Sequence, residues 1–493
     1  MSRNAAIVWF SKDLRLEDNP ALYYAADRHD VVIPVFIWAP EEDGAWPPGG
    51  ACRWWLHYAL QALGTALQGQ GLRLVLRTGS SLEALRDVIK ETGADAVYWN
   101  KRYEPALRQR DRHLAEALRE DGVACDAFEG AILHDPERVQ TGSSGSYRVF
   151  TPFWKKLQRV LDVSPPLPTP HLAWTKAPQA WPASLRLDAL GLLPTVDWAE
   201  GLRSTWTPGE QAARQRLRRF LDDTLLDYAT LRDRPDVDGT ARLSPYLCYG
   251  ELSPRQVWHA VKQGRQKPPM KEAAEVFLRQ IAWREFAYHL LYHYPETPTV
   301  PLKDTFEAFT WRDDAEGLRR WQQGRTGYPI VDAGMRQLWH IGWMHNRVRM
   351  IVASFLTKDL LLPWQEGARW FWDTLVDGDL ANNTMGWQWA AGSGADAQPF
   401  FRIFNPVSQG KRYDPEGVYV RRWVPELKAL PDRYLHQPWQ APADVLKKAG
   451  VVLGQTYPAP LVDHRFARER ALEAYQDVRS RRKLEGNDSV RGG

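Results

Sequence analysis

The chain has few cysteines, no long apolar run and little net charge, and each of these absences excludes a class of protein. Its 493 residues include three cysteines, Cys52, Cys125 and Cys248, which lie far apart and form no CxxC pair. We therefore expect no disulfide framework, no zinc site and no four-cysteine iron–sulfur cluster, and we assign no metal. Such a chain suits a reducing compartment, so we expect a cytoplasmic protein, associated with the nucleoid if it is bacterial.

Membrane insertion and secretion are not expected either. No apolar stretch is long enough to cross a bilayer, and the first apolar run is too short for a signal peptide. The formal net charge of +4, from 64 basic and 60 acidic residues, permits a polyanionic partner without requiring one. Tryptophan, in contrast, is abundant: 24 indoles raise the question of stacking or electron transfer, although tryptophan mostly packs.

The first 130 residues alternate short β-branched runs with helical patterns. Strands are predicted at residues 6–10, 31–38, 72–77, 96–100 and 123–128. This alternation predicts an α/β unit built on a doubly wound parallel sheet. The first strand is followed by SKDLRLEDNP rather than by GxGxxG, so the dinucleotide fingerprint is absent and any ligand of this unit must bind by other means.

Composition divides the rest of the chain into three parts. Residues 131–200 are rich in proline and lack periodicity, which indicates a long connector running over the surface of both halves. Residues 201–480 show helical periodicity and predict an all-α unit. Residues 481–493 are polar and are expected to fray. We expect the whole chain to be a monomer.

The densest group of functional side chains is DGDLANNTMGWQW, residues 377–389. An unpaired buried polar group costs about 1–3 kcal/mol, and a bound polar cofactor could supply partners for these carboxylates and amides. A core helix capped by an aspartate and packed through its tryptophans explains the same residues. Arg349, in GWMHNRVRM, is a natural ion-pair partner for Asp377 or Asp379.

Two more segments carry candidate binding groups. GTARLS, residues 239–244, places small residues, hydroxyls and a cation before a helix, which suits a phosphate; a helix cap by Ser244 is the alternative. Farther on, Gln280, Trp283 and Arg284 share one helix face. They suit a nucleic acid, since an indole stacks on a base and a guanidinium binds a phosphate. The alternative is a packed Trp283 with Arg284 paired to Glu285.

Motifs along nearly the whole chain resemble those of the photolyase/cryptochrome flavoprotein family. In order they are VWFSKDLRLEDNPAL, GTARLSPYL, WREF, TGYPIVDAGMRQL, GWMHNRVRM, ASFLTKDLL, DGDLANN, GWQW and FRIFNP. The resemblance implies an α/β N-terminal domain and an all-α C-terminal domain that binds FAD in a folded, U-shaped form. ACRWWLHYAL and VYWNKRYEP look closest to the class III and plant-cryptochrome-like branch.

The resemblance also implies roles for single residues. Those expected to hold FAD are Tyr228, Thr240, Ala241, Arg242, Leu243, Ser244, Arg284, Arg349, Asp377, Asp379 and Asn383, the last beside flavin N5. Those expected to pass an electron from the surface to the flavin are Trp311, Trp364 and Trp387. Those expected to bind DNA are Arg232, Gln280, Trp283, Arg284, Asn346, Arg347, Met350, Trp389 and Gln409, with Trp283 and Trp389 around a flipped cyclobutane pyrimidine dimer (CPD).

In the CPD enzymes of this family, light excites FADH⁻, which gives an electron to the dimer; the dimer splits and the electron returns. This chain carries Gln280 where those enzymes carry glutamate, and an amide donates a hydrogen bond but delivers no proton. Glutamine occurs there in the 6–4 branch, but Asn346 and Met350 replace the histidines of that branch. We therefore predict a CPD photolyase of reduced efficiency, slower than its Gln280→Glu variant.

The alternative is a non-repairing blue-light receptor of the cryptochrome kind, with an unknown signalling partner. The chain's short end after about residue 475 argues against it, since many signalling cryptochromes carry long extensions. Ala106 and Leu107 replace the Asn–Glu pair that holds the folate antenna in one bacterial type. A folate at another place stays open, and we assign no antenna.

Overall fold

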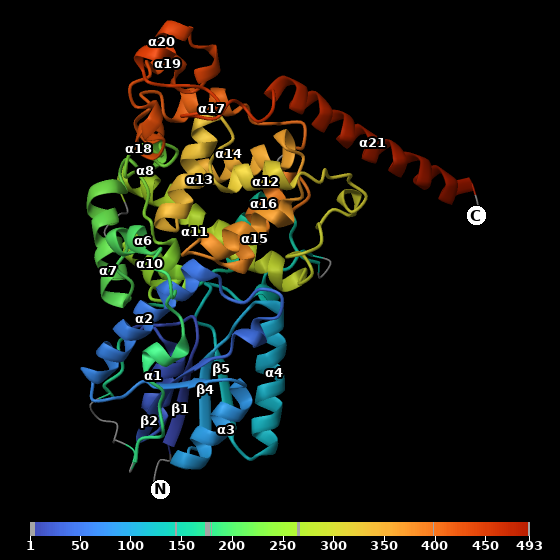
Figure 1. The fold of residues 1–493 in the computed structure, drawn as a ribbon. Coiled ribbons are helices and arrows are strands. Elements are labelled where there is room, and N and C mark those ends of the chain that lie inside the picture. Colours follow the sequence, from blue (N-terminus) through green and yellow to red (C-terminus); the bar gives the residue numbers. More distant parts are fainter. Residues whose placement is uncertain are drawn as a thin grey trace.

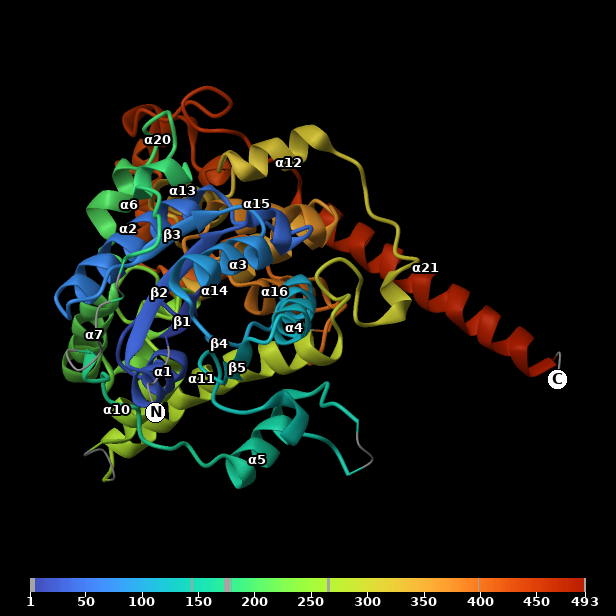
Figure 2. The same cartoon turned by 90° about the horizontal axis from the view of Figure 1, so that it is seen from below.

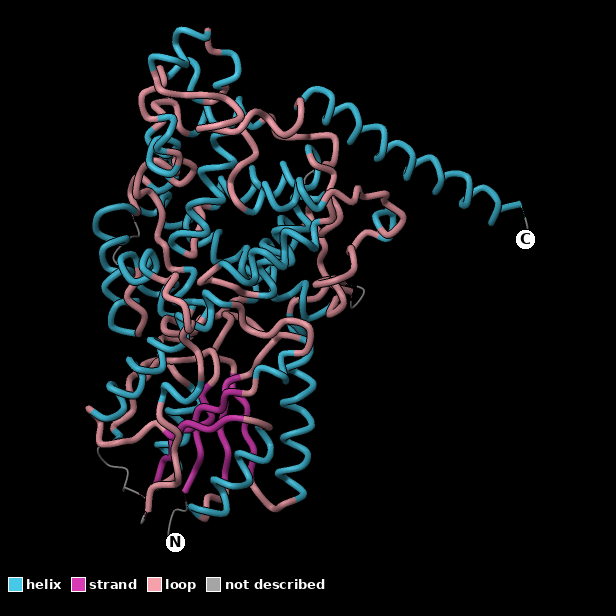
Figure 3. Tube along the Cα trace, viewed as in Figure 1, coloured by secondary structure: helices cyan, strands magenta, loops and turns pink. Residues whose placement is uncertain are grey.

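The computed structural model describes residues 5–142, 145–172, 178, 180–263, 267–397 and 399–491. An α/β unit carries the N-terminus, and a larger helical unit lies against it (Figure 1). The last helix, α21 (His464–Arg491), projects away from the body of the molecule. Strands occur in the N-terminal unit, while helices and loops make up the rest of the fold that Figure 3 displays.

Five parallel strands form the sheet of the N-terminal unit. They are β1 (Ala5–Phe10), β2 (Val31–Trp38), β3 (Val75–Thr78), β4 (Ala96–Asn100) and β5 (Ala124–Phe128), in the order β3-β2-β1-β4-β5. The prediction of a doubly wound parallel sheet is confirmed, with β3 starting three residues later than predicted. The strand order reverses between β1 and β4, and ligands of such sheets bind at the carboxyl ends of strands near this point.

Alternating side chains of the strands pack into two hydrophobic cores, one on each face of the sheet. Ala6, Val8 and Phe10 pack with α1 (Pro20–Arg28) and α2 (Gly50–Gln68). Ile7 and Trp9 pack on the other face with α3 (Ser81–Thr92) and α4 (Pro105–Glu120). Seen from below, α1 and α3 lie on opposite sides of the strands (Figure 2). Burial on both faces explains why β1, β2 and β4 are apolar runs without alternation.

The helical unit follows the periodicity of its sequence. Its helices are α6 (Glu200–Thr205), α7 (Glu210–Arg219), α8 (Tyr228–Leu231), α9 (Ser244–Cys248), α10 (Pro254–Lys262), α11 (Met270–His293), α12 (Ala315–Gln322), α13 (Pro329–Ile341), α14 (Asn346–Ser354), α15 (Trp364–Thr374), α16 (Leu380–Ala391), α17 (Pro406–Tyr413), α18 (Val418–Trp423), α19 (Asp432–Leu435), α20 (Ala443–Lys448) and α21. None of the helices in the described part combines the length and apolarity that a bilayer crossing needs.

Two segments that the sequence predicts to be irregular contain helix. The connector predicted at residues 131–200 contains a helix, α5 (Phe150–Val160), which buries Phe150, Phe153 and Leu157 against α11. Part of its proline-rich stretch, residues 173–177 and 179, lies outside the described residues. The end expected to fray from residue 481 continues α21 as far as Arg491, and residues 492–493 are again outside.

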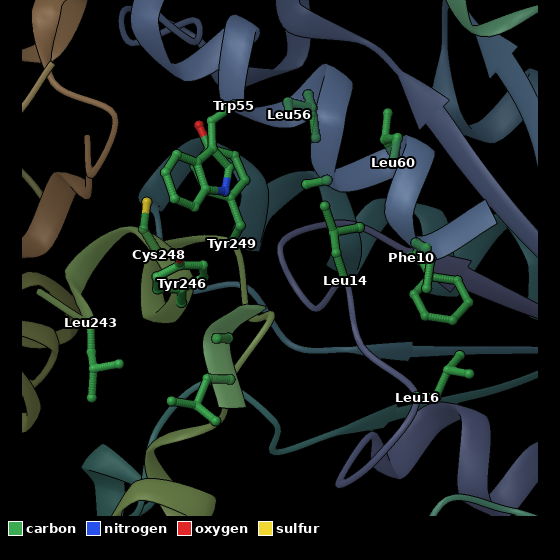
Figure 4. Packing of buried hydrophobic residues seen from close by; sticks show 14 of the residues in the cluster. Phe10, Leu14, Leu16, Trp55, Leu56, Leu60, Leu243, Tyr246, Cys248 and Tyr249 are labelled. Carbon is green, nitrogen blue, oxygen red and sulfur yellow. The ribbon is translucent and has the colours of Figure 1, made fainter. Parts of the chain in front are cut away.

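The two units share one hydrophobic core. Side chains from the loop after β1, from α2 and from α9 meet in a single cluster (Figure 4). Within it Trp55 contacts Tyr246 and Tyr249, with ring centroids 5.2 and 6.1 Å apart. Gly250 has φ +61°, and a Cβ there would lie 2.3 Å from the Lys12 carbonyl oxygen, so only glycine fits this approach. The loop after β1 is therefore fixed against the helical unit.

Candidate functional site

The loop before α16 presents two buried aspartates. Both oxygens of Asp377 accept from Arg349 Nη2, at 3.1 and 2.9 Å. Arg349 Nε donates to the Met344 carbonyl at 2.8 Å, which fixes the guanidinium from its other side. The predicted partnership of Arg349 with one of these aspartates is confirmed. Removing one member of a buried pair typically costs about 3–5 kcal/mol, so this pair sets the local structure firmly.

Asp379 caps α16 and also reaches α11. Its Oδ1 accepts from the Asn382 backbone N–H at 2.8 Å and from Asn382 Nδ2 at 2.7 Å, while Oδ2 accepts from the Tyr288 hydroxyl. Burial, followed by the charge of Asp379, raises the pKa of Tyr288 well above its usual value, so the phenol stays a donor. The aspartate cap that explained this segment without a ligand is thus present, and it leaves Asn383 unaccounted for.

Asn383 lies one turn into α16, beside α15. Its Nδ2 donates to the Ala368 carbonyl at 3.0 Å, which fixes the amide, and no donor in the described part of the chain takes Oδ1. One turn farther on, Gly386 is exposed, and a Cβ added there would meet nothing within 4 Å. An acceptor of fixed orientation therefore borders open space on this helix.

The GTARLS loop presents backbone donors. Arg216 of α7 donates to the carbonyls of Thr240 and Ala241, at 3.1 and 2.9 Å. Because a trans peptide directs N–H opposite to C=O, the amides of the following residues face the other way. Among the described residues, no protein acceptor takes the backbone N–H groups of residues 240–244. Arg242 itself has φ +48°, and such a turn with free amides suits an anion.

His345 contributes one more free donor. It is 2% exposed, and its Nδ1 accepts from the Arg347 backbone N–H at 3.2 Å. Burial lowers the pKa of His345 to about 4, with Arg242 and Arg349 adding to the effect. The ring is therefore neutral and carries its proton on Nε2, a buried atom without a hydrogen-bond partner. A buried, unused donor of this kind requires a partner that the protein itself does not supply.

The three tryptophans predicted to carry electrons run from interior to surface. Trp387 on α16 and Trp364 at the start of α15 are 2% and 1% exposed, and these two helices pack together. Trp311, in the loop before α12, is partly exposed and lies 4.4 Å from Phe309 between ring centroids. A Cβ at Gly367 of α15 would lie 2.0 Å from Trp387 Cη2, so the sequence leaves room for this indole.

The side chains predicted to face DNA lie on α8, α11, α14, α16 and α17. Arg232 Nη2 donates to Gln280 Oε1 at 3.1 Å. Trp283 is covered on one face by Phe150, with parallel rings 3.7 Å apart. Arg347 pairs with Asp233 at 3.0 Å. The remaining members, Asn346, Met350, Trp389 and Gln409, are exposed or partly exposed, and the Asn346 amide lies 3.9 Å from Met350 Sδ.

Arg284 and Ser244 have environments that the sequence did not indicate. The Arg284 guanidinium is buried: it donates to the Ala131 carbonyl at 2.7 Å and contacts the Tyr288 hydroxyl. Burial opposes its charge, yet Tyr288 and Asp379 raise the pKa of Arg284, and its expected contacts with FAD and DNA stay a prediction. Ser244 does not cap α9, because Leu243 holds the cap position and Ser244 begins the helix.

Two family models match the chain. The DNA photolyase model covers residues 6–171, and the FAD binding domain of DNA photolyase covers residues 277–477. A deoxyribodipyrimidine photo-lyase of Agrobacterium fabrum is 52% identical over 96% of this chain and 98% of its own length. The chain belongs to the photolyase/cryptochrome family. Cryptochrome-2 of Arabidopsis thaliana is 40% identical over 96% of this chain and 79% of its own length.

A solved structure extends this likeness to three dimensions. The crystal structure of a bacterial class III photolyase from Agrobacterium tumefaciens matches with a TM-score of 0.93 and 51% identity, over 97% of this chain and 98% of that one. The helical half is therefore the FAD-binding domain of a photolyase. In the described part of the chain, no group of three or more His, Cys, Asp or Glu side chains could hold a metal ion.

The residues present fit FAD. A flavin with a ribityl chain and diphosphate requires anion-binding amides, hydroxyl partners and a group beside N5. The GTARLS amides, the His345 Nε2–H donor and the fixed Asn383 oxygen supply groups of these kinds. The family match begins at Phe277, so FAD contacts at Tyr228 and residues 240–244 stay a prediction.

Three supporting residues were missed by reasoning from the sequence. Tyr288 stands four residues after Arg284 on α11, so helical spacing alone could have brought it to Asp379. Arg216 and Phe150 come from segments distant in sequence from their partners at 240–241 and 283. No local sequence pattern predicts contacts between such distant segments.

Proposed function

We propose that this protein is a light-driven class III CPD photolyase, which binds DNA, accepts a flipped pyrimidine dimer and restores two pyrimidines. The observation that carries the proposal is one arrangement: α11 and α16 pack together and bear Gln280, Trp283, Asn383 and Trp389. By the family resemblance, Trp283, Asn383 and Trp389 are the side chains used around the flavin and the lesion, and Gln280 takes the place of a glutamate. The 52% identity with a deoxyribodipyrimidine photo-lyase over almost the full length supports the same reaction.

The cofactor side positions FAD and holds its charges. When bound and reduced, FAD supplies the electron that light releases. Asn383 Oδ1, held by the bond of Nδ2 to Ala368, would be the acceptor for the flavin N5–H of bound, reduced FAD. The Arg349–Asp377 pair and the backbone amides of residues 240–244, which have no acceptor among the described residues, would hold the flavin and the diphosphate. These groups are in place before binding, so little ordering is needed.

The DNA side recognises backbone and lesion separately. Arg232, and Arg347 on release from its pair with Asp233, are cations for phosphates, which position the strand without reading its sequence. Trp283 and Trp389 offer indole faces to the flipped dimer. Phe150 stacks on the other face of Trp283 and restricts its movement. Gln280 donates to a pyrimidine carbonyl. Damaged DNA is the partner, and the protein acts as a monomer.

Photoreduction of the oxidised cofactor follows the three tryptophans. Electrons enter at the partly exposed Trp311 and pass through the buried Trp364 and Trp387. Burial of the two inner indoles keeps water from their charged forms, while exposure of the outer one allows exchange with a solvent reductant. Repair itself does not need this path once FAD is reduced.

The test is repair by the purified, reduced protein. A CPD-containing oligonucleotide is illuminated, and recovery of thymine absorbance is followed with a dark sample as control. Recovery that requires both light and reduced flavin supports the proposal. Flavin bound and photoreduced without any recovery contradicts it.

A cryptochrome-like receptor is the second candidate, favoured by the 40% identity with a plant cryptochrome and by Gln280. Binding in the dark separates the two. Submicromolar, lesion-selective affinity for a CPD oligonucleotide supports the enzyme, whereas equal affinity for damaged and undamaged DNA, with normal photoreduction, supports the receptor.

A further inference from the structure

Arg347, one of the two cations proposed to bind DNA phosphates, is already paired within the protein. Its Nη2 lies 3.0 Å from Asp233 Oδ1, and its guanidinium lies over the Tyr413 ring, 4.4 Å from the ring centroid. Its backbone N–H donates to His345 Nδ1 at 3.2 Å, which fixes the start of α14. The guanidinium is therefore held in one place, and the anion that neutralises it is a carboxylate of this chain.

The pair with Asp233 leaves part of the guanidinium unsatisfied. Arginine has five N–H donors in one plane, and Arg347 Nε is a buried atom without a hydrogen-bond partner. An unpaired buried donor costs about 1–3 kcal/mol. A phosphate can bind the Nε and Nη2 groups of an arginine together, through two of its oxygens. A phosphate in the place of Asp233 would therefore give Arg347 a hydrogen bond that the carboxylate does not supply.

Asp233 is the member of the pair that lies closer to solvent. Its side chain is 38% exposed, against 16% for Arg347. It lies in the loop after α8, and Arg347 is the cation with which it pairs there. A partly exposed ion pair contributes only about 0–1 kcal/mol. A competing phosphate can therefore displace Asp233 at small cost and leave its carboxylate to water.

Two neighbouring cations carry no carboxylate of their own. Arg232 directly precedes Asp233 and donates to Gln280 of α11. Arg412 is exposed on α17, with its guanidinium 5.2 Å from the same Tyr413 ring. In the part of the chain that the structure describes, neither arginine forms an ion pair. These two cations are open to any DNA that approaches, whereas the charge of Arg347 is neutralised.

Depth determines which phosphate can reach Arg347. This residue is mostly covered and stands between Asn346 and Met350 on α14, which by the family resemblance line the cavity for the dimer. Helix α14 packs against α16, which carries Trp389. Phosphates of a stacked duplex stay outside such a cavity, whereas extruding a nucleotide carries the phosphates on either side of it inward. Only a phosphate beside an extruded nucleotide can therefore compete with Asp233.

We propose that Asp233 is a specificity-determining residue, which keeps Arg347 neutralised in front of undamaged DNA and yields it to the phosphate beside a flipped nucleotide. Undamaged duplex then gains no contact at Arg347, while lesion-containing duplex gains one. The carboxylate also repels phosphates that stay outside the cavity. The inference deepens the proposed function and rests on it.

The test counts phosphate contacts from the salt dependence of binding in the dark. Each phosphate neutralised on B-DNA contributes about −0.9 to the slope of log K against log salt concentration. The slope is measured for the full chain with FAD bound, on one duplex with and without a CPD. The proteins are the native chain, Asp233→Asn, Arg347→Met and Asp126→Asn. The last is the matched control, because it frees Arg28 from an exposed pair in the N-terminal unit and changes the net charge equally.

The native slope should be steeper on the CPD duplex than on the undamaged one, by at least about 0.9. Asp233→Asn opens Arg347 to both DNAs, so its slope on undamaged duplex should steepen by about 0.9 and approach its slope on the CPD duplex. Its affinity for undamaged duplex should rise most at the lowest salt concentration. Arg347→Met should flatten the slope on the CPD duplex by about 0.9 and leave the slope on undamaged duplex unchanged. Asp126→Asn should match the native protein on both DNAs.

Native slopes that are equal on the two DNAs would overturn the inference, as would an Asp233→Asn protein with the native slope on undamaged duplex. An Arg347→Met protein whose slopes change equally on both DNAs, or on neither, would do the same. So would an equal steepening in Asp126→Asn, because net charge alone would then explain the effect. Failure of the proposed function is a separate result: a native protein without light-dependent recovery of thymine contradicts it whatever the slopes are.

Discussion

A single added methyl group tests whether Trp387 is as tightly packed as its place in the electron path requires. A Cβ at Gly367 would lie 2.0 Å from Trp387 Cη2, 2.4 Å from Cζ3 and 2.6 Å from Cζ2. The indole cannot move aside without displacing its neighbours. Phe371 and Trp321 contact it at 4.9 and 6.1 Å between ring centroids, and it is 2% exposed. Gly367→Ala must therefore displace the ring or the helix.

The expected magnitude follows from two opposing effects. Overpacking a filled core costs about 1–3 kcal/mol, whereas replacing a helical glycine by alanine contributes about 1 kcal/mol of stability. We expect a net loss of about 0–2 kcal/mol in the free energy of unfolding, small enough for the protein to fold. The displaced ring should slow photoreduction of oxidised FAD, because electron transfer depends on the placement of the indole.

The assay follows flavin absorbance under blue light with an external reductant, and urea unfolding in parallel. Gly64→Ala is the matched control: it is also a glycine within a helix, and its added Cβ would meet nothing within 4 Å. It should be as stable as the native protein or slightly more so, with unchanged photoreduction. If Gly367→Ala behaves like Gly64→Ala in both measurements, the packing argument is refuted.

Three further predictions concern the same structure. Trp387→Phe should retain FAD and slow its photoreduction strongly; photoreduction at the native rate would remove Trp387 from the path. Asp377→Asn should lower flavin occupancy and the free energy of unfolding, by up to about 3–5 kcal/mol, because Arg349 loses its charge partner; native flavin content in the purified variant would contradict this. Burial raises the pKa of Glu251 to about 8, whereas an unfolded glutamate releases its proton near its ordinary pKa of 4.5. Between these values the unfolded chain binds fewer protons, so stability should fall as the pH rises from about 5 to 8. Glu251→Gln sacrifices a hydrogen bond to Trp55 or Gly209 but should flatten that decline in urea unfolding, and an equal decline in both proteins would disprove the assignment.

The parallel sheet was predictable because β1, β2 and β4 are short apolar runs buried on both faces. The ion pair of Arg349 was predictable only as far as two candidate partners, Asp377 or Asp379, and the structure shows that it forms with Asp377. In both cases the local chemistry admits few solutions. A hydrophobic period of about 3.6 residues indicates a helix and a short apolar run indicates a strand, so both signals lie within one segment.

Other features depend on contacts between distant segments. The helix α5 lies in a stretch flanked by prolines, and its helical character depends on burying Phe150 and Phe153 against α11. The inward turn of Arg284 depends on the Ala131 carbonyl, and the orientation of Gln280 on Arg232, 48 positions away. From the sequence, the glutamine in the place of a glutamate predicts a weaker enzyme.

The central claim is that reduced FAD and the indole-bordered site beside Gln280 together split a pyrimidine dimer in light. The most direct measurement is the quantum yield of thymine recovery from a CPD oligonucleotide, with the fully reduced native protein and with Trp387→Phe after chemical reduction. We predict recovery in light, none in the dark, and equal yields for both proteins, since repair bypasses the tryptophan path. No recovery with bound, reduced flavin and saturating lesion would contradict the account.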